Sequence, residues 1–313
     1  MLSSATHIRH TRRGDIAEKV QVEVSDRTPR QLVDWADLRQ LREVAIIRDG
    51  HLGDLVMLTP TLRALRFFCP KTNFDLFCDQ QYLEVFYGNP VLARPLQEFQ
   101  RGSYDAVVDL RAFVERTPDV WTIDRISLFG RAFGISIWDG APTIRRATNF
   151  AAASADLLDG LGVEVGAPFV IIGPDASDGH RAMPDKLVEG VCDECRAAGM
   201  TPVVVGMTRG LQVSVGVLVS LVMEARAVVC GDNALYHIAG AFPHMTKSFP
   251  ILTTVPPELR TCWYKNCFPA VPAMPCAPCK EARTLPDGSP CLAVCMEAID
   301  PAAIVACIGG GPI

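Results

Sequence analysis

The sequence lacks the features that would place it in or across a membrane. No stretch approaches 18 uninterrupted apolar residues, roughly the length that a membrane-spanning helix needs. The opening residues, MLSSATHIRHTRRGD, carry positive charges without an apolar segment behind them, so a secretory signal peptide is not expected. We therefore expect a cytoplasmic protein, with a peripheral position at the inner face of the membrane as the alternative.

The sequence also lacks the marks of several large function classes. Its net charge is −5, whereas domains that follow a nucleic-acid backbone are usually basic, so nucleic acid is not expected as a partner. The G-x-x-x-x-G-K-[ST] pattern of phosphate-binding loops and the G-x-G-x-x-G pattern of dinucleotide-binding domains are both absent. The sequence therefore does not favour a kinase-like or a dinucleotide-binding protein.

What the sequence does contain is a repeated alternation of strand-like and helix-like segments. With 313 residues, 49% of them hydrophobic, the chain can bury the cores of two domains. Alternation of this kind is typical of parallel βαβ units. The expected fold class is α/β, with two doubly wound, Rossmann-like domains facing each other across a cleft. Strands are predicted at 44–47, 74–78, 106–110, 168–174, 201–206, 227–230 and 249–255, and helices at 55–68, 82–87, 121–133, 147–160, 184–198, 215–225 and 235–242.

Composition suggests where the domains begin and end. Residues 1–43 are predicted to be an N-terminal extension that contains a short amphipathic helix at 29–42. Residues 44–160 are predicted to form the first domain and residues 168–313 the second. The short, glycine-rich stretch LGVEVGAP lies between them and is the candidate linker.

The turn between the first predicted strand and the next helix reads RDGHLGD, from Arg48 to Asp54. In open α/β sheets ligands bind at the carboxyl ends of the strands, which is where this turn lies. Gly50 and Gly53 let the backbone bend and let a ligand approach closely. Asp54 stands where the N-cap of the following helix is expected, so capping alone is the structural alternative to a functional role.

The wider segment, IIRDGHLGDLVMLTPTLRALR, resembles the opening motif of the bacterial heptosyltransferases, glycosyltransferase family 9. That family has a strand, then Arg-x-x-x-x-Gly-Asp, then a helix with Thr-Pro and Leu-x-x-Leu. The resemblance implies that Asp54 is the general base on the acceptor hydroxyl, with Arg48, Gly50 and Gly53 in the acceptor-side loop. The matching residues are Arg48, Gly53, Asp54, Thr59, Pro60, Leu62 and Leu65.

The second half carries a weaker match to the same family, and the resemblance runs from about residue 44 to residue 304. In VSVGVLVSLVMEARAVVCGDNALYHIAGAF, Asp232, His237 and Ala239 match the family pattern Asp-Ser/Thr-Gly-Pro-x-His-x-Ala. Other residues replace the Ser/Thr, Gly and Pro, and Arg181 takes the place of a family Lys. The resemblance implies GT-B architecture, an acceptor-binding first domain, and a second domain that binds a nucleotide-sugar donor, in this family ADP-heptose.

Transfer of a sugar from such a donor requires stabilisation of the departing diphosphate. No D-x-D pair stands in a plausible place, so the chemistry is expected to need no metal. Backbone N–H groups before a helix, together with the fork of donors on Arg181, could take that role. Asp232 could equally be a helix cap, Arg181 a surface cation and His237 a packed core histidine. The predicted donor-binding residues are Arg181, Gly231, Asp232, Asn233, Ala234 and His237.

Six of the twelve cysteines lie between Cys262 and Cys295. Cys276-x-x-Cys279 and Cys291-x-x-x-Cys295 have the spacing of a tetrahedral metal site. The intervening segment is rich in turn residues and has little core of its own, so a metal ion could hold it. We predict one structural zinc or iron ion on these four cysteines, with Cys262 and Cys267 as possible substitutes and thiols or disulfides as the alternative. Some autotransporter heptosyltransferases of the family hold iron with such cysteines.

The residues support three functional hypotheses. The first is an inverting glycosyltransferase whose acceptor is a glycan, a lipid-linked glycan, a protein or a modified nucleobase. The second is a nucleotide-sugar-binding protein of the same fold that has lost transfer, suggested by the replacements in DNALYH. The third is a metal-stabilised interaction protein built on the cysteine segment. The sequence does not indicate an oligomeric state.

Overall fold

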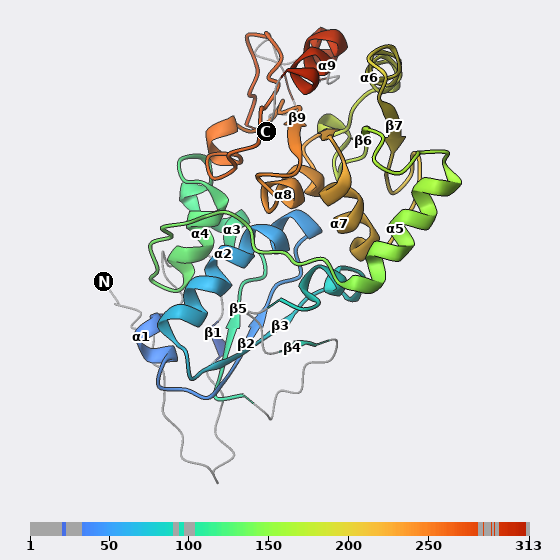
Figure 1. Cartoon of the computed structure of the whole chain (residues 1–313). Coiled ribbons are helices and arrows are strands. Elements are labelled where there is room, and N and C mark those ends of the chain that lie inside the picture. Colours follow the sequence, from blue (N-terminus) through green and yellow to red (C-terminus); the bar gives the residue numbers. More distant parts are fainter. Residues whose placement is uncertain are drawn as a thin grey trace. The chain divides into compact units, whose positions relative to one another are not determined.

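The computed structural model describes residues 21–22, 33–89, 94–96, 104–280, 284, 289, 291 and 294–310 (Figure 1). The chain divides into two compact units, Met1–Arg145 and Arg146–Ile313. Each unit contains one sheet, and the strand pairs within both sheets are parallel. The predicted α/β class is therefore confirmed.

The first unit is built on a five-stranded sheet in the order β1-β5-β2-β3-β4. The central strand β2 contributes the fully buried residues Val44, Ala45 and Ile46, because a parallel strand covered on both faces needs a continuous apolar run. Val44 pairs with Phe74 on one side and with Ala106 on the other. The strands are β1 Gln21–Val22, β2 Glu43–Ile47, β3 Asn73–Phe77, β4 Arg94–Leu96 and β5 Ala106–Asp109.

The helices of the first unit differ from the prediction at their ends. The predicted helix 121–133 is divided, because Asp124 caps a new helix by accepting a hydrogen bond from the Ser127 N–H. The predicted helix 29–42 lies partly outside the described residues, and within its described part, 33–42, the α-helix covers only Trp35–Leu38. The segments are α1 Trp35–Leu38, α2 Leu52–Phe68, α3 Phe113–Arg116, α4 Arg125–Ala132 and the 3₁₀ turns Gln80–Phe86 and Pro118–Trp121.

The second unit is built on a four-stranded sheet in the order β7-β6-β8-β9. Its core joins β6 and β8 to helices α6 and α9, through residues such as Ile172, Val229, Leu187 and Ile304. The strands are β6 Phe169–Gly173, β7 Thr201–Val204, β8 Ala227–Cys230 and β9 Lys247–Pro250. The helices are α5 Thr148–Gly160, α6 Asp185–Ala197, α7 Val215–Glu224, α8 Ala234–Gly240 and α9 Pro301–Gly309, with 3₁₀ turns at Gly179–Arg181, Pro257–Leu259 and Val294–Ala298.

The division between the units falls earlier than predicted. The structure places it after Arg145, so α5 belongs to the second unit and not to the end of the first. A Cβ on Gly216 would lie 2.3 Å from the ring of Phe150, so α5 packs closely on α7. Arg146 also forms an ion pair with Glu224 at the end of α7. The glycine-rich stretch after α5 is a turn inside the unit, with positive φ at Gly162 and Gly166.

Within the described residues, the helices are all too short or too polar to cross a membrane.

Candidate functional site

Asp54 lies in the first turn of α2 and does not cap it. The helix begins at Leu52 and its N-cap is His51, so Asp54 is the third helical residue. The prediction that Asp54 is the cap of a helix 55–68 is therefore wrong. A carboxylate in the first turn still interacts favourably with the helix dipole.

Two guanidinium groups meet the carboxylate of Asp54. Arg125 Nη1, at the start of α4, lies 2.5 Å from Asp54 Oδ1, and Arg48 Nη2 lies 3.2 Å from Oδ2. The Asp54 side chain is only 8% exposed. Charges of opposite sign at this distance favour the ionised carboxylate and fix its orientation. Arg125 is 71 residues from Asp54 in the sequence and was not among the predicted site residues.

Arg48, which contacts Asp54, is almost fully buried, with 1% of the residue exposed. Its guanidinium donates to the Leu110 carbonyl at 2.9 Å and to the two carboxylate oxygens of Glu115 at 3.2 and 2.8 Å. Burial acts to raise the pKa of Glu115, but the hydrogen bonds and charge of Arg48 outweigh it and leave that pKa below its usual value. Arg48 therefore orients Asp54, and its place in the acceptor-side loop stays a prediction.

Gly50 is required by the same cluster. A Cβ on this residue would lie 2.6 Å from Arg48 Nε and 2.9 Å from Asp54 Oδ2. Such contacts are closer than real Cβ atoms tolerate, so a larger residue would displace either the guanidinium or the carboxylate. Gly53 is the second residue of α2 and is partly buried.

In the second unit, Asn233 caps α8. Its Oδ1 accepts a hydrogen bond from the Leu235 N–H at 3.0 Å, and its Nδ2 donates to the carbonyls of Gly173 and Asp175 at 2.9 and 2.8 Å. Asparagine is among the preferred N-cap residues, so the helix start is well capped. The alternative that Asp232 is the cap is wrong.

Asp232 is buried and contacts two polar side chains. The Tyr236 hydroxyl donates to Oδ1 at 2.8 Å, and Arg181 Nη1 lies 3.5 Å from Oδ2. Burial acts to raise the pKa of Asp232, but the charges of Arg260 and Arg181 outweigh it, so this pKa is lowered. Arg260 is itself buried and was not predicted as a site residue.

The loop before α8 is closed by bonds within the protein. The N–H groups of Asp232 and Asn233 donate to the carbonyls of Arg181 and Gly231 at 3.3 and 2.9 Å. A Cβ on Gly231 would lie 2.2 Å from the Arg181 carbonyl oxygen, so only glycine allows this approach. The predicted row of backbone N–H groups toward the diphosphate is therefore largely engaged internally. Ala234 is the first residue of α8.

His237 is a packed histidine, as the structural alternative proposed. Only 3% of the residue is exposed, and Nδ1 lies 2.7 Å from the Tyr264 hydroxyl. Arg181, by contrast, is half-buried, and its Nη2 donates to Ser177 Oγ at 2.5 Å. It projects from the 3₁₀ turn Gly179–Arg181 against Asp232 and is not an isolated surface cation.

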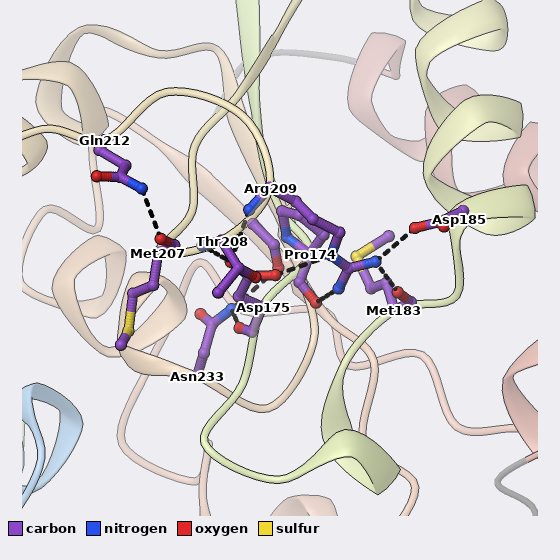
Figure 2. A network of polar contacts seen from close by, with 10 residues as sticks. Pro174, Asp175, Met183, Asp185, Met207, Thr208, Arg209, Gln212 and Asn233 are labelled. Atoms are coloured by element: carbon purple, nitrogen blue, oxygen red, sulfur yellow. Dashed lines mark hydrogen bonds and ion pairs between the residues drawn. The ribbon is translucent and has the colours of Figure 1, made fainter.

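A second polar network lies where the strands of the second unit's sheet end, and the sequence had not indicated it (Figure 2). Asp175 follows β6, Arg209 follows β7 and Asn233 follows β8, and hydrogen bonds join all three loops. Burial acts to raise the pKa of Asp175, but hydrogen bonds from Thr208 and Arg209 lower it to about 2. The sequence offers one signal for it, an arginine three residues after the predicted strand 201–206.

The four predicted metal-binding cysteines lie on the second unit, and each is partly buried and outside any disulfide. Burial first, and then the charges of Cys276, Cys291 and Cys279, raise the pKa of Cys295, which indicates that the four thiols lie in the same region. Among the described residues, the side chains of His, Cys, Asp and Glu nowhere form a group of three set to hold a metal ion. The metal site stays a prediction.

Solved structures identify proteins with the same fold. A glycosyltransferase family 9 protein from Veillonella parvula has 12% identity and a TM-score of 0.61, with 74% of this chain and 86% of that chain covered. ADP-heptose LPS heptosyltransferase II from E. coli has 11% identity and a TM-score of 0.63, covering 84% and 96%. No family model and no curated sequence matches the chain.

A third similar structure contains a metal. The iron-containing dodecameric glycosyltransferase TibC from enterotoxigenic E. coli has 13% identity and a TM-score of 0.64, with 89% of this chain and 78% of that chain covered. A second structure of TibC holds ADP-D-β-D-heptose. The likeness to heptosyltransferases that the motifs indicated is thus confirmed in the fold.

Proposed function

We propose that this protein is an inverting glycosyltransferase of the heptosyltransferase type, with a nucleotide-diphosphate sugar as donor. The observation that carries the proposal is Asp54. It belongs to the Arg-x-x-x-x-Gly-Asp motif, it lies in the first turn of the helix after β2, and its carboxylate forms ion pairs with Arg48 and Arg125. The shared fold with enzymes of this class supports the same reading.

The reaction assigns Asp54 the role of general base. The acceptor hydroxyl oxygen attacks the anomeric carbon of the sugar, and its proton passes to the Asp54 carboxylate. The bond from the anomeric carbon to the diphosphate breaks, and the electron pair leaves with the diphosphate. Attack opposite the leaving group inverts the anomeric configuration. The network of Arg48 and Arg125 holds the base in one position throughout.

The donor site is proposed around Arg181. Its guanidinium is partly exposed, and a cation there would stabilise the negative charge that grows on the departing diphosphate. Gly231, Asp232, Asn233 and Ala234 form the segment that Arg181 contacts, and His237 lies buried in the helix that follows, beside Tyr264. ADP-heptose is the proposed donor because TibC, a protein of the same fold, holds that molecule. The acceptor class stays open between a glycan, a lipid-linked glycan and a protein.

A structural metal ion belongs to the proposal. Cys276, Cys279, Cys291 and Cys295 offer four partly buried sulfur donors in one region, a set that suits tetrahedral zinc or iron. The ion would order the cysteine segment, from Cys276 to Cys295, and take no part in the transfer. Two hydrogen bonds already join this segment to the rest of the unit, from the Cys279 N–H to the Thr253 carbonyl and between His180 Nε2 and the Cys291 carbonyl.

The test is titration calorimetry of the purified protein with a panel of nucleotide sugars, at physiological pH and ionic strength. We expect ADP-heptose to bind more tightly than UDP- or GDP-linked sugars, and its slow hydrolysis to release ADP. Binding without any hydrolysis or transfer, even with acceptor extracts, would support the non-catalytic alternative. No binding of any nucleotide sugar would end the proposal.

A further inference from the structure

Residues 174–183 form a loop whose two ends meet. The Met183 N–H donates to the Pro174 carbonyl at 2.8 Å and closes the neck of the loop. The head of the loop contains the 3₁₀ turn Gly179–Arg181, capped by Asp178. Arg181, the proposed diphosphate-binding residue, therefore projects from a closed loop whose position depends on its neck.

Arg209, from the loop after β7, binds both sides of this neck. Its Nη2 donates to the Pro174 carbonyl at 2.7 Å, and its Nη1 donates to the Met183 carbonyl at 2.7 Å. Nη1 also reaches Asp185 Oδ1, in the first turn of α6, at 2.8 Å. Figure 2 shows the guanidinium of Arg209 in the centre of these partners. One side chain thus fixes the start and the end of the loop that carries Arg181.

Asp175 in turn fixes Arg209. Its Oδ1 accepts from Arg209 Nε at 2.8 Å. Its Oδ2 accepts from the N–H groups of Thr208 and Arg209 at 2.7 and 3.2 Å, and from the Thr208 hydroxyl at 3.0 Å. A Cβ on Gly206 would lie 2.6 Å from the same oxygen, so the turn after β7 is shaped around this carboxylate. All three guanidinium nitrogens of Arg209 have partners inside the protein.

The head of the loop meets the residues proposed for the donor. The Arg181 carbonyl accepts from the Asp232 N–H at 3.3 Å, and Arg181 Nη1 lies 3.5 Å from Asp232 Oδ2. The head is also held by Thr253, whose hydroxyl donates to the His180 carbonyl at 3.1 Å. A shift at the neck would therefore move the guanidinium of Arg181 relative to the loop before α8.

We propose that Arg209, oriented by Asp175, is a positioning residue for the donor. It closes the neck of the loop 174–183 and so holds Arg181 where the diphosphate binds, without touching the donor itself. The part of this inference that concerns binding rests on the proposed function. The part that concerns the neck of the loop does not depend on it.

Arg209→Lys is the informative variant, because it keeps the charge but cannot present a planar fork to several acceptors. We expect it to weaken ADP binding roughly tenfold, the effect of losing one or two charged hydrogen bonds at a site they position. Arg196→Lys is the matched control, since Arg196 is an exposed arginine of α6 in the same unit, paired with Asp193. It should change ADP binding by less than about twofold.

A double-mutant cycle shows whether Arg209 acts through Arg181. If it does, Arg181→Ala together with Arg209→Lys should bind ADP no more weakly than Arg181→Ala alone, because the residue being positioned is already absent. Effects that add in the double variant would overturn the inference. Asp175→Asn is the second route to the same end, should Arg209→Lys lower the melting temperature of the whole protein; it should reproduce the loss of ADP binding.

Hydrogen exchange in the protein without nucleotide separates this inference from the proposed function. Amides of residues 174–183 should exchange faster in Arg209→Lys than in the wild type and in Arg196→Lys. Unchanged exchange would overturn the closed neck, whatever the protein binds. Faster exchange with unchanged ADP binding would overturn the positioning role. If the wild type binds no nucleoside diphosphate at all, the proposed function fails, and the exchange result still decides the role of Arg209 in the loop.

Discussion

The surroundings of Asp54 have two opposing effects on its proposed role as general base. The ion pairs with Arg48 and Arg125 fix the orientation of its carboxylate. Cations beside a carboxylate favour its ionised form and so make it a weaker proton acceptor. A weak base in a fixed position suits a reaction in which the acceptor hydroxyl becomes acidic only as it attacks. The burial of Arg48 behind Asp54 means that the arrangement cannot relax easily.

Asp54→Asn should remove transfer and leave donor binding intact. Asparagine keeps the shape and can still accept from one arginine, but it cannot take a proton. We expect kcat to fall by roughly 10²- to 10⁴-fold, the usual contribution of a general base, with an unchanged donor Kd by calorimetry. Asp119→Asn, at a more exposed ion pair with Arg131, is the control and should keep full turnover. A turnover of Asp54→Asn close to that of the wild type would remove Asp54 from the mechanism.

Arg125→Gln should change the pH dependence of the reaction. Removing one of two cations beside Asp54 raises the pKa of that carboxyl group, so the acidic limb of kcat/KM should move to higher pH. The free energy of unfolding should fall by about 2 kcal/mol, the usual contribution of a hydrogen bond between charged groups, because Asp54 keeps Arg48 as its second partner. The pH profile and urea unfolding measure the two effects. An acidic limb at the wild-type pH would show that Arg125 does not act on the base.

At the scale of secondary-structure elements, hydrogen bonds join the three loops after β6, β7 and β8 into one network. Its members are Asp175, Arg209 and Asn233. Parallel strands bring their carboxyl ends to one edge, and hydrogen bonds between the loops then give that edge a fixed shape. The charge of Asp175 is central to it, since this carboxylate accepts from two backbone and two side-chain donors.

The stability of this edge should depend on acid. Asp175 has a pKa of about 2 in the folded protein and an ordinary value of 3.8, so its contribution is present above about pH 4 and is lost as the pH falls toward 2. The contribution is at most about 2 kcal/mol by linkage. Urea unfolding of the wild type and Asp175→Asn at pH 6 and pH 3 measures it. The wild type should lose more stability than the variant on acidification, and equal losses would contradict the assignment.

The elements also show what a sequence can and cannot reveal. The strands β2 and β8 were predicted to within one residue because buried parallel strands are continuous apolar runs. The start of α2 was placed wrongly because Asp54 is a good cap residue in a position where it serves another purpose. Asp54 and Arg181 came from motifs. Arg125, Arg209 and Asp175 did not, because their roles arise only when loops far apart in sequence meet.

The proposed metal site in the cysteine segment can be tested directly. We expect about one zinc or iron per chain by elemental analysis, and Cys276→Ser should lower metal content and melting temperature together. Cys307→Ser, at an exposed cysteine of α9 outside the segment, is the control and should change neither. If Cys276→Ser also changes neither, the site does not exist with these ligands, and Cys262 or Cys267 becomes the next candidate.

At the scale of the whole molecule, the chain consists of two α/β units whose cores are built separately. The division at Arg145 matters because it decides which core α5 completes. A glycine-rich stretch after a helix looks like a linker, but here it only turns the chain from α5 into β6. The packing of Phe150 against Gly216 is the feature that assigns α5 to the second unit.

Two fragments test this division directly. A fragment 146–313 keeps α5 on α7 and should fold cooperatively, whereas a fragment 161–313, cut at the glycine-rich stretch, exposes the face of α7 around Gly216. We expect the shorter fragment to be less stable by about 3 kcal/mol or more, the usual cost of removing a large aromatic side chain and its neighbours from a packed surface. Urea unfolding followed by circular dichroism measures the difference. Phe150→Ala in the full chain should reproduce part of the loss, and Phe268→Ala, at a half-exposed ring elsewhere in the unit, should cost less. Equal stability of the two fragments would return α5 to the first unit, because a helix that contributes nothing to the second core has no reason to belong to it.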